Sequence, residues 1–186
     1  MSRNGHKRVC IVVTIAIVVM NFGLWSSLGA PVAYAIPCGV NCENITNTPT
    51  VAVTLNGVDQ TVSYALAFSL NNLSALGWNV TVTSTQFATG ATPVRTLPTT
   101  ASSVTGVTAV CTTGQICTAL PQNAVIYPVA VPAGNSAPTP VKLYSDQSNT
   151  GIGTFDLSAT ITVTVPANAY AGTYTSTITL AYVIGP

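Results

Sequence analysis

The chain has 186 residues, of which 48% are hydrophobic and only 5% are charged, and its formal net charge is +1. Five Lys and Arg residues are too few to neutralise a row of phosphates, so we exclude nucleic acid as a partner. The many Val, Ile and Thr residues exclude a disordered chain, because disordered chains lack the apolar residues that build a core.

The first 35 residues have the parts of a secretory signal peptide. Basic residues precede the apolar run 9–20, and Ala33-Tyr34-Ala35 has the small-x-small pattern of a cleavage site. We therefore predict a signal-peptide helix over residues 1–35, cleavage after Ala35, and a secreted protein located outside the cell, at the cell surface or in the cell wall. The alternative is a retained helix that anchors the chain in a membrane, since the apolar run approaches the ~20 residues that a span needs.

The part beyond Ala35 is about 150 residues long, which suits one domain with a core. It holds two cations, Arg95 and Lys142, and four carboxylates, and its formal charge is therefore −2. It contains no histidine, which excludes Ser-His-Asp and Cys-His catalysis and histidine metal sites. Asp146 and Asp156 could in principle form the carboxylate pair of a glycosidase. We instead expect Asp146 in a turn and Asp156 on the polar face of a strand, and predict a protein that is not an enzyme and uses no metal or cofactor.

Alternating apolar and polar residues dominate the rest of the chain, which is typical of strands with one face in a core. The clearest runs are 155–165, with apolar odd positions, and 173–184, with apolar even positions. Leu76, Trp78, Val80 and Val82 alternate in the same way. Further strands are expected over residues 50–55, 61–70, 104–110 and 124–131, with a turn at Asn56-Gly57. The pattern predicts one all-β domain over residues 51–186, an antiparallel β-sandwich of the immunoglobulin-like or jelly-roll-like kind, preceded by an N-terminal arm over 36–50.

Four cysteines lie beyond Ala35, and an even number in an exported chain suggests two disulfides. We favour the local pairs Cys38–Cys42, in the arm, and Cys111–Cys117. Cross-pairing remains an alternative, and a zinc site is disfavoured because the spacings are not those of zinc knuckles.

Three segments together resemble the WxL-type cell-surface domain of Gram-positive and related bacteria. They are GWNVTVTSTQF (77–87), AVIYPVAVPA (124–133) and VPANAYAGTYTSTITLAYVIGP (165–186). The two motifs that name the family read Trp78-Asn79-Val80 and Leu180-Ala181-Tyr182 here, so the second tryptophan is absent and the chain resembles a divergent member. The resemblance implies a secreted β-sandwich that associates non-covalently with the cell wall, with peptidoglycan or another wall glycan as partner, in a binding or adhesive role.

Aromatic side chains are the candidate ligand-binding residues, because their faces can stack on sugar rings. The candidates are Trp78, Tyr127, Tyr144 and Tyr170. For Trp78 the position in phase with Leu76, Val80 and Val82 favours a core residue whose indole N–H finds a partner. A second hypothesis is a structural subunit of a surface layer or pilus-like fibre that self-associates by strand addition, with Cys38–Thr50 as the donated strand.

Overall fold

The computed structural model describes residues 8–20, 44–47, 49–136 and 138–185, which form strands and loops without a helix. Within these residues, therefore, no helix is long and apolar enough to cross a membrane. The strands are β1 (Arg8–Met20), β2 (Asn44–Ile45), β3 (Thr50–Thr54), β4 (Gln60–Asn72), β5 (Trp78–Thr85), β6 (Ala88–Thr89), β7 (Ser102–Cys111), β8 (Val129–Ala130), β9 (Ala133–Gly134), β10 (Val141–Asp146), β11 (Gly153–Val165) and β12 (Gly172–Ile184).

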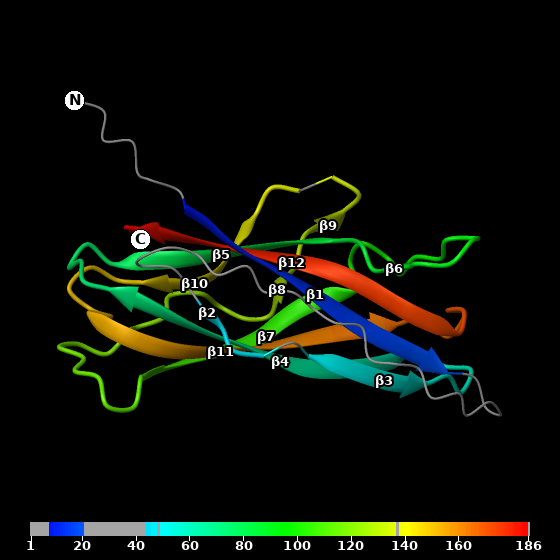
Figure 1. The fold of residues 1–186 in the computed structure, drawn as a ribbon, viewed down its shortest axis with the longest axis horizontal. Coiled ribbons are helices and arrows are strands. Elements are labelled where there is room, and N and C mark those ends of the chain that lie inside the picture. The colour runs from blue at the N-terminus through cyan, green and yellow to red at the C-terminus, as the bar shows by residue number, and fades with distance from the viewer. Residues whose placement is uncertain (1–7, 21–43, 48, 137, 186) are drawn as a thin grey trace.

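Two sheets pack face to face and enclose one core (Figure 1). The first sheet has the order β10-β5-β12-β1-β3, with β6 paired to β12 and β9 paired to β5. The second has the order β2-β4-β11-β7-β8. Most neighbouring strands are antiparallel; β1 with β3 and β5 with β9 are the parallel pairs among the described strands. The all-β sandwich expected from the sequence is confirmed.

The long strands β11 and β12 follow the predicted alternation. Every odd residue of β11 from Phe155 to Val165 is buried, and so is every even residue of β12 from Tyr174 to Tyr182. Val, Ile and Thr suit these positions because β-branched side chains pack well on a pleated, half-buried surface. Ser176 interrupts the apolar face, but its hydroxyl donates a hydrogen bond of 2.6 Å to the Thr85 carbonyl oxygen, which satisfies it.

The apolar run predicted to be a signal-peptide helix is a strand where the structure describes it. Residues 8–20 form β1, which runs antiparallel to β12 from Arg8 to Val19 and parallel to β3 from Ala16 to Met20. Figure 1 shows β1 in blue, crossing the molecule along β12 towards β3. The helix is therefore wrong for residues 8–20. A run rich in Val and Ile is compatible with a strand as well as with a helix. Here the run forms a strand because it pairs with the edge of β12. The remainder of residues 1–35, with the Ala35 cleavage site, lies outside the described residues.

Other local predictions also need correction. Over 124–131 only Val129–Ala130 is strand, because the Asn123 side chain accepts a hydrogen bond from the Val125 N–H and holds the chain in a turn. The sequence also gave no sign of β10, which lies beside β5 at the edge of the first sheet. Leu76 is exposed rather than in phase with Trp78, because Gly77 has a φ of 75° and re-aims the chain just before β5 begins.

Candidate functional site

Trp78, the first aromatic candidate, is part of the core. Its side chain is 0% exposed, and its ring stacks on that of Tyr144 with centroids 4.9 Å apart and an interplanar angle of 11°. Tyr182 lies on another side, with ring centroids 6.3 Å apart. The indole Nε1–H donates to the Gly151 carbonyl oxygen at 3.1 Å, so the predicted core position and polar partner are both confirmed.

A buried polar cluster surrounds the indole. The Gly151 carbonyl oxygen also accepts a hydrogen bond of 2.7 Å from the Asn72 amide, and the Asn72 side-chain oxygen accepts one of 3.0 Å from the Tyr182 hydroxyl. These bonds tie the end of β4 to β12 and to the loop after β10. Tyr182, which stands at the Leu position of the second Trp-x-Leu-like segment, Leu180-Ala181-Tyr182, therefore contributes to the interior at this end of the sandwich rather than to its surface.

Asp146 closes the same cluster. We predicted it in a turn, but it is the last residue of β10 and is 0% exposed. Its Oδ1 accepts hydrogen bonds from the Gln122 N–H at 2.6 Å and from the Thr150 hydroxyl at 2.8 Å, whereas its buried Oδ2 has no hydrogen-bond partner in the part of the chain that the structure describes. The carboxylate thus holds two loops together, which explains why a charged residue ends this strand.

The structure does not bring the two carboxylates of the glycosidase alternative together. Asp156 lies near the start of β11, beside Ser69 and Val110 of the second sheet, and its side chain alternates away from the core. Asp146 is buried at the end of the first sheet. Among the described residues, no group of three or more His, Cys, Asp or Glu side chains is placed to hold a metal ion.

Two further aromatic candidates are also engaged within the fold. Tyr144 is 2% exposed, and burial raises the pKa of its hydroxyl well above the ordinary value, with the Asp146 carboxylate and Tyr127 adding to the rise. Tyr127 is half-buried; its hydroxyl donates to the Leu143 carbonyl oxygen at 2.7 Å and accepts from the Asn123 amide at 2.7 Å. Burial raises the pKa of Tyr127 too, although the bond from Asn123 opposes the rise. The Tyr144 ring is therefore closed to a sugar, and the Tyr127 hydroxyl already has both its bonds within the fold.

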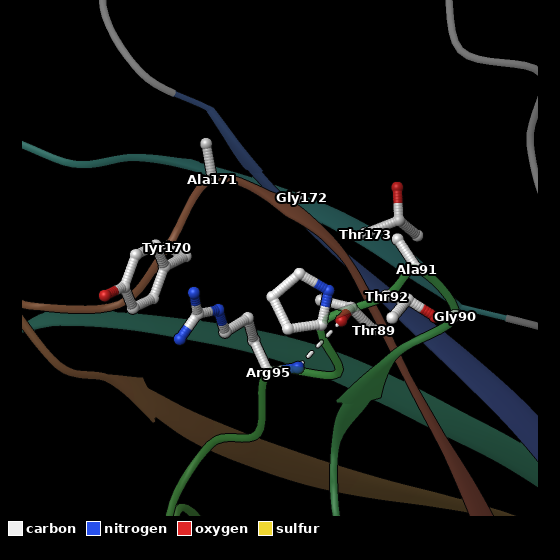
Figure 2. A pocket seen from close by; sticks show the side chains of 10 residues that line it. Thr89, Gly90, Ala91, Thr92, Arg95, Tyr170, Ala171, Gly172 and Thr173 are labelled. Atoms are coloured by element: carbon white, nitrogen blue, oxygen red, sulfur yellow. Dashed lines mark hydrogen bonds between the residues drawn. The ribbon is translucent and has the colours of Figure 1, made fainter.

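Tyr170 differs, because it is 57% exposed and lies at a hollowed end of the sandwich. The Arg95 guanidinium carbon lies 3.9 Å from the centre of its ring, a cation–π contact (Figure 2). The loop after β6 positions Arg95: the Arg95 N–H donates to the Thr89 hydroxyl at 2.9 Å, and the Thr89 N–H donates to the Arg95 carbonyl oxygen at 2.9 Å. The loop before β12 positions Tyr170, whose carbonyl oxygen accepts a hydrogen bond of 3.0 Å from the Tyr174 hydroxyl.

Shallow grooves lie on both sides of the Arg95–Tyr170 pair. One, of about 490 Å³, is lined by the loop 89–95 and by Tyr170–Thr173. The other, of about 450 Å³, is lined by residues 94–98, Gln86, Tyr174 and the loop from Pro166 to Tyr170. No ion pair to Arg95 is found among the described residues. The guanidinium therefore keeps N–H donors for a ligand while one of its faces rests on the ring.

Sequence reasoning identified Tyr170 but missed Arg95. Composition could have pointed to Arg95, because it is one of only two Lys or Arg residues beyond Ala35. Nothing in the sequence showed that it meets Tyr170, because the pairing of β6 with β12 brings residues about 75 positions apart together.

The disulfide predicted between Cys111 and Cys117 is present, with an S–S distance of 2.10 Å. Cys38 and Cys42 lie outside the described residues.

Compared with known proteins, the chain matches no family model, no curated protein and no solved structure.

Proposed function

We propose that the protein is an exported, non-enzymatic cell-surface protein that associates non-covalently with the cell wall. The partner is peptidoglycan or another wall glycan, and the role is that of a binding or adhesive module of the divergent WxL type. Support for the wall comes from the leader-like N-terminus and from the three segments that resemble the WxL domain.

The Arg95–Tyr170 pair is the observation that carries the proposal. An aromatic ring in a shallow groove packs against the C–H face of a sugar, and a guanidinium donates in a planar fork to hydroxyl or carboxylate oxygens. Open grooves on both sides suit an extended chain of sugars better than a small enclosed ligand, since small-molecule sites bury most of their ligand. The buried Trp78 and Tyr144 would stiffen the domain and would not touch the glycan.

Co-sedimentation of the purified full chain with isolated cell walls tests this function. We expect Tyr170→Ala and Arg95→Gln to weaken wall binding at least tenfold. Lys142→Gln is the matched control for charge, because Lys142 lies on β10 and is not among the residues that line the two grooves. Ile126→Ala is the control for an exposed apolar residue. Binding unchanged in both groove variants would contradict the assignment of the site, and no binding by the unaltered chain would contradict the function.

A structural subunit assembled by strand addition is the second candidate, and β1 is the observation that favours it. From the sequence we predicted the arm Cys38–Thr50 as the donor; residues 38–43 of this arm lie outside the described residues. Its described part is used within its own sandwich, where Asn44 and Ile45 pair with β4 and Thr50 begins β3. The domain would instead act as the acceptor of a strand, because the first sheet contains a position between β12 and β3 that the N-terminal strand β1 fills.

A further inference from the structure

Strand β1 occupies a slot in the first sheet, with β12 on one side and β3 on the other (Figure 1). It pairs with β12 along nearly the whole length of that strand, from Gly172 to Tyr182. An apolar segment of 13 residues is therefore accommodated as an internal strand over part of its length.

The slot is part of the core. Ile15 and Ile17 of β1 are 0% exposed and Val19 is 2% exposed, and all three belong to the same hydrophobic cluster as the residues of β11 and β12. An occupant of this slot therefore needs apolar side chains at alternate positions, facing the second sheet, as well as a backbone that can pair with β12.

No other described strand closes the slot when β1 is absent. The five residues of β3 lie opposite Ala16–Met20 only, so they cover one end of the slot. Along Thr177–Tyr182, β1 is the one strand of the described residues that pairs with this edge of β12. Without β1, that edge would present a row of unpaired N–H and C=O groups over an open core, which is a template for another strand.

The connection between β1 and the rest of the domain is long. Residues 21–43 separate Met20 from Asn44, so β1 is far in sequence from both of its partners in the sheet, β12 and β3. The cleavage predicted after Ala35 falls within this connection. Cleavage would therefore separate β1 from the domain while leaving β12 and β3 intact.

We propose that the slot between β12 and β3 is an acceptor for a strand from another polypeptide, and that Arg8–Met20 fills it only until the leader is cleaved. The donor is an extended segment with apolar, β-branched side chains at alternate positions, running antiparallel to β12. The uncleaved chain is thus capped by its own leader, and cleavage opens it to its partner. This proposal does not depend on glycan binding at the Arg95–Tyr170 pair.

Strand exchange in the full chain tests the proposal. A protease recognition sequence is inserted after Ala35, the protein is folded, and the connection is then cut. The probe is a fluorescent peptide of residues 8–20 with Cys10→Ser and terminal lysines for solubility. The control peptide also carries Ile15→Ser and Ile17→Ser. If the insertion disturbs folding, a second variant places the recognition sequence after Ala30.

We expect the uncut protein to exclude the peptide. The cut protein should bind one peptide per chain, release fragment 1–35, and regain the melting temperature of the uncut protein; the control peptide should bind at least tenfold more weakly. Larger assemblies that form after cutting and are blocked by the peptide would also support the acceptor, and would identify a second copy as donor.

Three results would overturn the proposal. One is a cut protein that loses fragment 1–35, takes up no peptide and keeps its melting temperature, since the first sheet would then be stable without a strand in the place of β1. Another is equal binding of the two peptides. The third is a fragment 1–35 that stays bound to the cut protein at every concentration of the peptide.

Discussion

Gly151 lies where the Trp78 cluster leaves no room for a side chain, and substituting it tests how this end of the sandwich is built. Its φ is +57°, a conformation that costs a residue with a Cβ roughly 1–2 kcal/mol. A Cβ would also meet Oδ2 of Asp146 and would lie 2.5 Å from Nε1 of Trp78. Crowding of this kind in a packed core costs about 1–3 kcal/mol. We therefore expect Gly151→Ala to lower the free energy of unfolding by roughly 2–5 kcal/mol.

Gly57 provides the matched control. Its φ is +85°, but a Cβ there would meet nothing within 4 Å, so Gly57→Ala should cost only the backbone term of roughly 1–2 kcal/mol. Urea unfolding of the two variants, followed by circular dichroism, measures the difference. A Gly151→Ala protein no less stable than Gly57→Ala would refute the packing described around Trp78 and Asp146.

Two further predictions concern the stability of the domain. Burial raises the pKa of Tyr64, whose hydroxyl has no hydrogen-bond partner among the described residues, and burial, Asp146 and Tyr127 raise the pKa of Tyr144. Because the folded state holds these protons more tightly than the unfolded state, stability should be constant below about pH 10 and fall above it, by up to ~1.4 kcal/mol per pH unit for each tyrosine. Urea midpoints from pH 8 to 11 check this, and Tyr64→Phe should reduce the slope without loss of stability at pH 8; an unchanged slope would contradict the burial of its hydroxyl. Replacing Cys111 and Cys117 by serine should cost about 2 kcal/mol, the loop entropy of a short bridge, and a variant as stable as the parent in thermal melts would contradict a stabilising role.

The sequence was most informative where a strand has one buried face and one exposed face. In β11 and β12 the alternation of apolar residues matches the alternation of burial. It was less informative for β5, where Asn79, Thr83 and Ser84 are buried as well as the apolar residues. β9 pairs with β5 at Ser84–Thr85, and the Pro132 carbonyl oxygen just before β9 accepts hydrogen bonds from the Thr83 and Ser84 hydroxyls. A polar residue under a loop cannot be told from an exposed one by periodicity.

Long-range pairing explains the remaining differences. The leader-like run became β1 because β12 offers it an edge, and that edge is formed by residues more than 150 positions away. In the same way, Arg95 lies in the loop after β6 and Tyr170 in the loop before β12, and the two meet only in the folded protein. Sequence reasoning therefore proposed Tyr170 alone. Asp146 was expected in a turn because Asn and Gly follow it, but its burial depends on Gln122 and Thr150.

Wall binding by the Tyr170→Ala protein tests the proposed function most directly. The full chain and this variant are mixed with isolated cell walls, and the bound fraction is measured across protein concentrations beside Ile126→Ala, with a thermal melt to show that all three are folded. We predict that Ile126→Ala binds as the unaltered chain does and that Tyr170→Ala binds at least tenfold more weakly. Equal binding by all three folded proteins would contradict the role of the Arg95–Tyr170 pair.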